Sequence, residues 1–494
     1  MSRQIILVRK LLSFPMLLAR RPCLVLLFLF VFCLRPAADE LADLLLLAEQ
    51  NSPVLQAARQ RVERAMLKHG ELMEFFDPAL FAAAGRATDY RELPLQSNYS
   101  VLGSNSLEVQ GGVEVPLELG AYVSVGAASR LLYEPVGYDR LYQNLFGVRV
   151  RVPLLRDRGF SLFGYRRQAA LAEYNQSVSE LLASCQELRH RVELAYVTVY
   201  EQLSAYHIAQ EASKRFEALV KVARELTGLK VIPDYEVHSP ERELQIGLDD
   251  EEQAKNRYEL SLLELHTLVG GGAELSLHGE AQAVIDPDEQ ERALPEVAPE
   301  RAFQNRGDML SIEHRIERTR AQYAAEEEQM KDDVYLHAGA TVQAENTDHP
   351  FERHRKLGQD YLAGEITVVW SRPLDYRGSK KRLSIFESEI AELKAELACK
   401  ELQIRQAMQN AQLNFASAHK RLILISNGLR AAQATLEAEQ ERFRLGEGSS
   451  TDVLDAQKNL TVMLLRQTLA AAERQKAKCS YFYACGYEPE EIEP

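Results

Sequence analysis

An internal duplication constrains the fold of this chain more than any other feature of its sequence. The segment that begins at Asn51 recurs at Asn305, and each copy is followed by a similar triplet, Val62-Glu63-Arg64 or Ile316-Glu317-Arg318. Similar segments predict similar structural units, so we expect two repeats. The predicted parts are a first repeat over 39–270, a proline-bearing linker over 271–300, a second repeat over 301–486 and an acidic tail over 487–494.

Each repeat is expected to contain one very long helix, because no proline falls between Pro153 and Pro233 or between Pro373 and Gly446. About 65 helical residues reach roughly 95 Å. Apolar residues in the first helix follow a 3-4 spacing from Leu171 to Val199, which is typical of a coiled-coil seam. A return helix of about 30 residues cannot cover such a partner alone, so we expect each opening helix to stack end to end with a return helix. The predicted helices span 39–76, 160–227 and 240–269 in the first repeat, and 297–331, 379–445 and 452–485 in the second.

Between the opening helix and the long helix, each repeat shows the period-2 alternation of β-strands, over about 79–155 and 334–374. Four strands are clear, and a further hairpin that turns at Glu118-Leu119-Gly120 would bring the number to six. One face of the strands is apolar and the other is polar. The polar face carries the predicted lumen-facing residues Glu108, Glu114, Arg149, Arg151 and Glu365.

This alternation, together with nearby tyrosines, is typical of a transmembrane β-barrel, although a sheet in a soluble protein is the simpler alternative. Barrels made from one chain begin at about eight strands. Four to six strands per chain therefore require several chains to share one barrel.

The N-terminus predicts a secretory signal peptide over residues 1–38. Basic residues precede an apolar run from Cys23 to Leu34, which is followed by Pro36-Ala37-Ala38. A transmembrane anchor is the alternative, but it needs about 20 apolar residues. Beyond Leu34 no apolar stretch approaches that length, so we expect any membrane role to come from β-strands or from a surface helix.

Charge and cysteine content narrow the possible functions. The chain has 58 basic and 72 acidic residues, and six of the basic ones lie in residues 1–38, so the remainder carries a net charge of −20. Such an acidic chain is a poor partner for nucleic acid. The six cysteines show no zinc-finger spacing, and no cofactor or metal site is predicted. His349 and His354 are interpreted as residues of a solvated loop.

The layout resembles that of the TolC family of outer-membrane efflux channels over nearly all of the chain. The most specific similarity is the run from Arg442 to Gln457, which contains Phe443, Gly446, Asp452 and Asp455. The run from Gly228 to Asp234 has the spacing of the other helical tip of the family, and Val152 to Gly159 resembles a strand-to-helix crossing. The resemblance implies a mixed α+β, predominantly helical fold: a long antiparallel coiled-coil helical barrel joined to a transmembrane β-barrel that three chains share.

The same resemblance implies a function and a set of partners. The homotrimer would be a passive export duct, with its strands in the lipid of the outer membrane of a Gram-negative bacterium and its helices in the periplasm. It would dock onto a periplasmic adaptor and an inner-membrane transporter, in a tripartite efflux or type I secretion system. The implied periplasmic gate residues are Asp452, Asp455, Phe443 and Asp234, and the implied adaptor-contacting tip residues are Gly228, Leu229, Leu445 and Gly446.

The chain also departs from the family pattern at both tips. Phe443 lacks a tyrosine hydroxyl, and Gly448 stands where an arginine latch occurs, so the gate is expected to be held differently. Ser239 as N-cap, with Pro240 at the first helical position, predicts a long first tip loop over 228–239, against 446–451 for the second.

Physical chemistry alone allows a simpler interpretation of the aspartates. Asp452 and Asp455 share a face of the first helical turn, where Thr451 or Asp452 could simply cap the helix. In a trimer the same two residues would form two rings of three negative charges. For the whole chain, the alternative function is a periplasmic coiled-coil adaptor, which would have one helical hairpin between lipoyl-like sheets. No catalytic constellation is found, so an enzyme is not expected.

Overall fold

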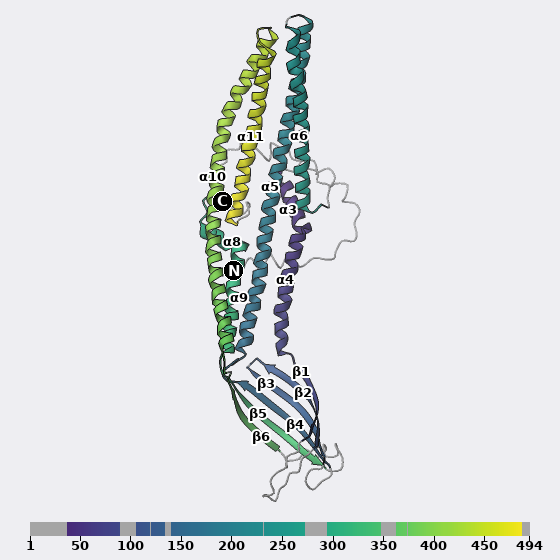
Figure 1. The fold of residues 1–494 in the computed structure, drawn as a ribbon, viewed down its shortest axis with the longest axis vertical. Coiled ribbons are helices and arrows are strands. Elements are labelled where there is room, and N and C mark those ends of the chain that lie inside the picture. Colours follow the sequence, from purple (N-terminus) through teal and green to yellow (C-terminus); the bar gives the residue numbers. More distant parts are fainter. Residues whose placement is uncertain are drawn as a thin grey trace, which may run out of the picture. The chain divides into compact units, whose positions relative to one another are not determined.

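The computed structural model describes residues 37–88, 105–118, 120–133, 140–230, 232–271, 294–346, 362–372 and 374–486. These residues form long helices and one antiparallel sheet (Figure 1). Most of the predicted signal peptide, the acidic tail and the loop with His349 and His354 lie outside the described residues.

The chain divides into two compact units, and the long helices contribute to both. The tip unit comprises Met1–Gln50, Val192–Glu291 and Ala418–Gln475. The sheet unit comprises Asn51–Arg191, Arg292–Ser417 and Lys476–Pro494.

Six strands pair in sequence order, each antiparallel to the next, in the sheet unit. The strands are β1 (Ala79–Thr88), β2 (Asn105–Leu117), β3 (Ala121–Tyr133), β4 (Arg140–Pro153), β5 (Asp333–Asn346) and β6 (Leu362–Ser371). Pairing of β4 with β5 joins the two repeats into one sheet. The number of strands that the sequence left open is therefore six in the described part of the chain.

The additional strands come from the hairpin at residues 118–120. The backbone amide of Gly120 donates a hydrogen bond of 2.9 Å to the carbonyl of Leu117, and Gly120 has a φ of 85°. The backbone of Gly120 also lies close to that of Gly159: a Cβ atom on Gly120 would be only 2.5 Å from the Cα atom of Gly159. Glycine is required here both by the left-handed backbone and by the close approach.

The register divides the sheet into the two faces that the alternation predicts. One row across the sheet consists of Leu80, Val113, Val125, Val148, Ala340 and Gly364. Large apolar side chains on this face are open to the surroundings in a single chain, with Leu80 83% and Ile366 80% exposed. The adjacent row on the other face carries Glu114, Arg149 and Glu365.

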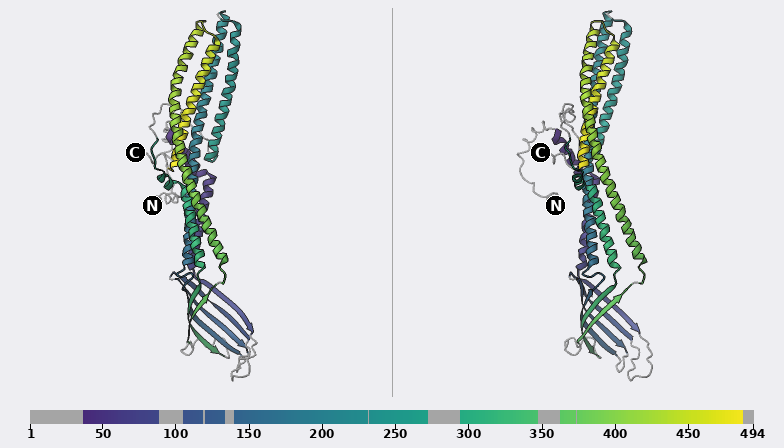
Figure 2. Two further views of the ribbon diagram at one scale, coloured as in Figure 1. Left: turned by 60° about the vertical axis from the view of Figure 1, so that its left-hand side comes forward. Right: turned by 90° about the vertical axis from the view of Figure 1, so that its left-hand side faces the viewer.

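The sheet unit packs its helices around a core of apolar residues. Ile312 and Ile316 of α9 contact Leu393 of α10, and the two helices run side by side in both views of Figure 2. The junction of α8 and α9 packs against the end of α11 through Met309, Tyr481 and Cys485. The helices that contribute are α4 (Pro53–Glu71), η1 (Leu72–Phe76), α5 (Ser161–Gly228), α8 (Pro299–Asn305), α9 (Gly307–Gln329), α10 (Arg377–Arg444) and α11 (Ser450–Cys485).

The opening helix of each repeat is interrupted at equivalent residues. Helix α3 (Ala37–Asn51) ends and α4 begins around Ser52, and α8 and α9 are separated by Arg306. Pro53 lacks an amide hydrogen and interrupts the helical hydrogen bonding in the first case. Arg306 leaves the helical conformation, with φ −84° and ψ 123°, in the second.

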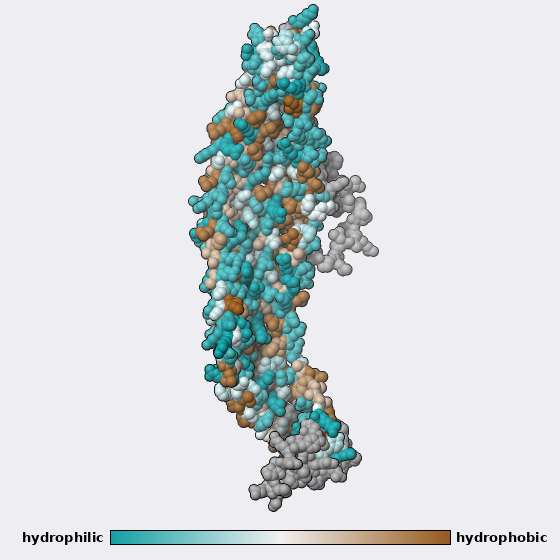
Figure 3. All heavy atoms as spheres, in the orientation of Figure 1, coloured by the Kyte–Doolittle hydropathy of each residue, from teal (hydrophilic) through white to brown (hydrophobic). Residues whose placement is uncertain are grey.

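In the tip unit, α5 and α10 continue as partners of α6 (His238–Val269) and α11. A hydrophobic cluster, the tip cluster, lies between these four helices and includes Phe216, Leu219, Leu436, Phe443 and Val453. Figure 3 shows that apolar residues are scattered over a mainly hydrophilic helical surface. None of the described helices has the length and apolar composition needed to cross a membrane.

One detail of the predicted helices is wrong. Helix α6 begins at His238, not at Pro240, and follows the 3-10 helix η2 (Asp234–Val237), so Ser239 is not its N-cap. Pro240 is accommodated because the first amides of a helix have no intrahelical partner. The seam along α5 is only partly buried: Val192 and Val199 are inaccessible, but Leu171 is 46% exposed. One chain alone does not cover the side of α5 that carries Leu171.

Candidate functional site: the helical tips and the charged sheet face

The second tip is a tight turn built on Gly446. The amide of Gly446 donates to the carbonyl of Phe443 at 3.0 Å, and the amide of Glu447 donates to the carbonyl of Arg442 at 2.9 Å. This pair of bonds is a Schellman motif, which needs a left-handed residue after the helix. Gly446 supplies it with a φ of 75°. The neighbouring Leu445 is 65% exposed at the turn.

Ser449 caps the start of α11. Its hydroxyl accepts a hydrogen bond from the amide of Thr451 at 3.2 Å, and the Asp452 carboxylate accepts one from the amide of Ser449 at 3.4 Å. This reciprocal arrangement is a capping box with aspartate in the third position. Asp452 therefore helps to cap α11, as the simpler interpretation anticipated. It does so from the third helical position, whereas Ser449 is the N-cap residue itself.

The structure separates the predicted gate residues into exposed and buried ones. Asp452 and Asp455 are both exposed, on the opposite side of α11 from the buried Val453 and Leu454. Phe443 is only 2% exposed and belongs to the tip cluster of the same chain. Its side chain supports the turn from inside, whereas both carboxylates are open to the surroundings, that of Asp452 while it also accepts from the Ser449 amide.

The first tip presents a different surface. Helix α5 ends at Gly228, and Leu229 behind it is 73% exposed. Lys230 takes a left-handed conformation with a φ of 60°. Asp234 and Tyr235 are exposed at the start of η2, whereas Val237 at its end packs into the tip cluster.

Glu236 joins the two tips, and sequence reasoning missed it. Its carboxylate Oε2 accepts hydrogen bonds from the Ser450 hydroxyl at 2.5 Å and from the Ser450 amide at 3.3 Å. The Ser450 hydroxyl also lies 3.0 Å from the Glu236 carbonyl oxygen. A carboxylate at the first residues of α11 is favoured by the helix dipole. The spacing of residues around Glu236 in the sequence does not indicate that its side chain lies next to Ser449 and Ser450 of the other tip.

The five predicted lumen residues all lie on the charged face of the sheet and take part in cross-strand ion pairs. Glu108 pairs with Arg130 at 2.8 Å, Arg151 lies 3.9 Å from Glu114, and Arg149 lies 3.6 Å from Glu365. The last pair spans a whole strand, because Gly339 stands between the two residues in the register and has no side chain. The three glutamates are thus balanced by three arginines.

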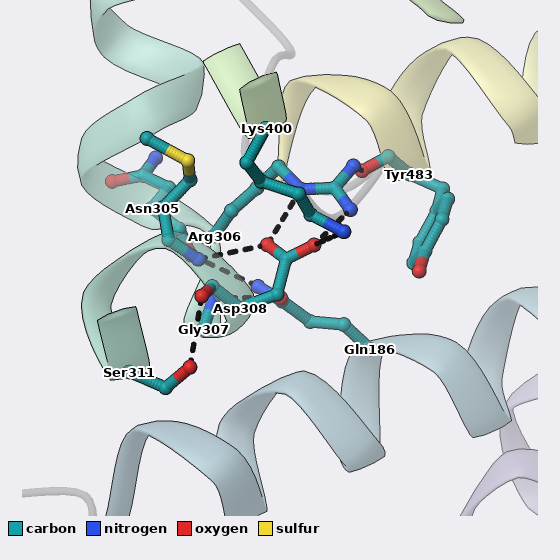
Figure 4. A network of polar contacts seen from close by, with 9 residues as sticks. Gln186, Asn305, Arg306, Gly307, Asp308, Ser311, Lys400 and Tyr483 are labelled. Atoms are coloured by element: carbon teal, nitrogen blue, oxygen red, sulfur yellow. Dashed lines mark hydrogen bonds and ion pairs between the residues drawn. The ribbon is translucent and has the colours of Figure 1, made fainter. Parts of the chain in front are cut away.

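A buried polar network fixes the break between α8 and α9 (Figure 4). Arg306 binds the Asp308 carboxylate with two hydrogen bonds of 2.9 and 2.7 Å, and Lys400 of α10 lies 2.9 Å from the same carboxylate. Arg306 also donates to the carbonyl of Tyr483 near the end of α11 at 3.3 Å. Burial alone would raise the pKa of Asp308, but the hydrogen bonds and charges of Arg306 and Lys400 lower it to about 2.

The network extends to α5 through an amide and an aromatic stack. Gln186 donates to the carbonyl of Asn305 at 3.0 Å and accepts from the amide of Gly307 at 3.2 Å. The rings of His190 and Tyr483 are parallel within 4°, with centroids 4.4 Å apart. Burial and the nearby charge of Arg306 lower the pKa of His190. Four helical segments therefore meet at one charged centre.

Among the described residues no group of three or more histidine, cysteine or acidic side chains could hold a metal ion. The four described cysteines form no disulfide.

Comparison with known proteins identifies the class. Residues 298–480 match the family model of the outer membrane efflux proteins. No curated protein sequence matches the chain. Among solved structures, the outer-membrane channel MtrE of Neisseria gonorrhoeae in its open state is 17% identical, with a TM-score of 0.65 over 91% of this chain and 89% of MtrE.

Two more solved structures have the same fold. A structure of CusC, described in terms of folding and transmembrane channel formation, is 15% identical with a TM-score of 0.68, over 91% of this chain and 92% of that one. The outer membrane protein VceC of Vibrio cholerae is 17% identical with a TM-score of 0.64, over 91% of this chain and 96% of VceC.

The fold is that of outer-membrane efflux channels, and the second repeat matches the family model of the outer membrane efflux proteins. Residues 298–480 carry the sequence pattern of the outer membrane efflux proteins, and the described chain has the fold of these channels, as the resemblance to the TolC family implied. The solved structures that share this fold include an outer-membrane channel of Neisseria gonorrhoeae and an outer membrane protein of Vibrio cholerae. The alternative of a periplasmic adaptor does not match the described chain, which has two helical hairpins and one six-stranded sheet.

Proposed function

We propose that this protein is a passive export duct in which three copies of the chain share one transmembrane barrel. The observation that carries the proposal is the sheet, which has an exposed apolar face, a charged face, and β1 and β6 as its outermost strands. The outermost strands of an open sheet have unpaired backbone groups, and lipid cannot satisfy them. Pairing of β6 with β1 of the next copy would close the barrel without a free edge.

The proposed duct is part of a tripartite efflux or type I secretion assembly. A channel without a nucleotide-binding motif needs a partner to supply energy, which an inner-membrane transporter would do. A periplasmic adaptor would contact the exposed tip residues Gly228, Leu229, Leu445 and Gly446. The support for this contact is the exposure of Leu229 and Leu445, since apolar side chains at a loop are favourable binding points when a partner covers them.

The proposed gate consists of Asp452 and Asp455, with Asp234 on the neighbouring tip. Three copies would bring their exposed carboxylates around one axis, where like charges attract cations and repel one another. Phe443 contributes by holding the turn between α10 and α11 in place from inside the tip cluster.

The proposal is tested by single-channel conductance of the detergent-extracted oligomer in a planar bilayer. Wild-type protein is compared with the double variant Asp452→Ala plus Asp455→Ala. We expect a small, cation-preferring conductance that increases in the variant. A conducting pore that is indifferent to the substitutions would refute the acidic gate and keep the duct, and an assembled oligomer without conductance would refute the duct.

A further inference from the structure

A cavity of about 670 Å³ lies where the sheet meets the helices of the sheet unit. Its lining comes from the end of α4, η1, the start of β3, the turn before α5 and the first four turns of α5. These parts belong to one chain and to one compact unit. The cavity is therefore present in each copy of the chain.

Aromatic rings form one side of this cavity. Phe160 is 3% exposed and lies at the centre of a ring cluster, with centroids 5.3 Å from Phe75 and 5.0 Å from Tyr122. Phe75 also stacks on Phe163 at 5.1 Å and remains 36% exposed. Packing around Phe160 holds the ring of Phe75 in place, so its accessible surface is available to a ligand without reorganisation.

The cavity opens on the charged face of the sheet. Tyr122 lies opposite Arg151 in the register, and the Arg151 guanidinium lies 4.3 Å above the centre of the Tyr122 ring. Arg151 in turn faces Glu114 on the same side. The cavity therefore shares a face with the residues that would line the duct.

The charged side chains that line the cavity form oppositely charged pairs, except for one carboxylate. Lys68 is paired with Glu173 at 2.8 Å, and Arg166 interacts electrostatically with Asp157. Asp157 also accepts a hydrogen bond of 2.8 Å from the Leu162 amide. In the part of the chain that the structure describes, no hydrogen bond or ion pair involves the carboxylate of Glu71. The lining thus combines rings with one unbalanced negative charge.

We propose that this cavity is a binding site for aromatic organic cations. The rings of Phe75, Phe163 and Tyr122 offer flat apolar surfaces and the negative faces of their π-systems, which attract cations. Glu71 supplies the opposite charge at the rim. Binding at this site does not depend on the proposed duct. Its consequence does: if the protein is a duct, such cations bind transiently at the junction during export.

The test uses tetraphenylphosphonium as the probe and tetraphenylborate as an anion of the same shape. Calorimetric titration of the purified full chain, with binding to empty micelles subtracted, is expected to show saturable binding of tetraphenylphosphonium and none of tetraphenylborate. Glu71→Gln is expected to weaken tetraphenylphosphonium binding at least fivefold. Phe75→Leu is expected to weaken it further, because the substitution removes a ring face.

The matched control is Glu63→Gln, which removes an exposed carboxylate from the same helix outside the cavity. We expect its affinity to equal that of the wild type. Helical circular dichroism establishes that each variant is folded. Because Glu71 is exposed, its substitution keeps the proposal testable even if Phe75→Leu does not fold.

Three outcomes overturn the proposal: no saturable binding, equal binding of the two probes, or an unchanged affinity in Glu71→Gln. Conductance of the same preparation without probe separates this inference from the proposed function. A conducting protein that does not bind tetraphenylphosphonium refutes only the site. A protein that binds it but does not conduct refutes the duct and leaves the site in place.

Discussion

The hydroxyl of Ser450 donates a hydrogen bond of 2.5 Å to Oε2 of Glu236, and so links the two helical tips of one chain. Ser450 is inaccessible to solvent, and its amide lies 3.3 Å from the same oxygen. One carboxylate thus receives donors from the first residues of α11. Together with the Ser449 hydroxyl, which lies 3.4 Å from the same oxygen, this contact bonds the two tips directly.

We expect Glu236→Gln to loosen the tips. The amide keeps the size of the side chain but loses the charge that favours the N-terminus of α11, at a cost of about 1–3 kcal/mol. The open probability of the channel in a planar bilayer should rise. Glu447→Gln, which neutralises an exposed acid of the neighbouring loop, is the matched control. Equal open probability in the two variants would contradict a linking role for Glu236.

Acid should weaken the network around Asp308. Its carboxyl has a pKa of about 2 in the folded chain and an ordinary value of 3.8, so its ion pairs stabilise the fold fully above the higher value. This stabilisation, about 2 kcal/mol, is lost as the pH falls from about 4 through 2. Denaturant unfolding followed by helical circular dichroism at pH 6, 4 and 3 measures it.

Asp308→Asn separates this group from the other carboxyls. The variant should be less stable than the wild type at pH 6, because Arg306 is left buried without its partner. The difference between the two proteins should shrink as the pH falls. A constant difference from pH 6 to pH 3 would show that Asp308 does not titrate as the structure implies.

Substitution of Arg149 should change ion selectivity with little effect on stability. The strands pair Glu108, Glu114 and Glu365 with three arginines on the charged face. Arg149→Gln leaves Glu365 unbalanced and should shift the reversal potential in a KCl gradient toward cations. Glu365→Gln should shift it toward anions. Because both side chains are more than half exposed, unfolding should be nearly unchanged. Shifts in the same direction would exclude a lumen position for this pair.

The two tip glycines should respond in opposite ways to alanine. Gly446→Ala places a Cβ atom on a residue with a φ of 75° and should lower the free energy of unfolding by about 1 kcal/mol. Gly228 is the last residue of α5, and a Cβ atom there would contact nothing within 4 Å. Gly228→Ala should therefore be neutral or stabilising, by up to about 1 kcal/mol. Chemical unfolding of both variants checks the contrast, and equal destabilisation would contradict it.

Elements with a local signal were predictable from the sequence. Alternation assigned Val113 and Arg149 to opposite faces of the sheet before any pairing was known, because successive residues of a strand point to opposite sides. The absence of proline indicated the two long helices in the same way. The start of α6 was misplaced because a 3-10 turn and an α-helix tolerate the same residues at their beginning.

The sequence by itself determined the duplication, the helix and strand periods, the two faces of the sheet and the acidic tip. The periods, the faces and the acidic tip depend on residues that are close together in the chain, and the duplication shows in the similarity of two such local runs. Only the tertiary structure decided that Glu236 bonds Ser450, that Arg306 and Lys400 share Asp308, and that Phe75 and Tyr122 border one cavity. Those relationships join residues far apart in the chain, and packing of the helices and pairing of the strands bring them together.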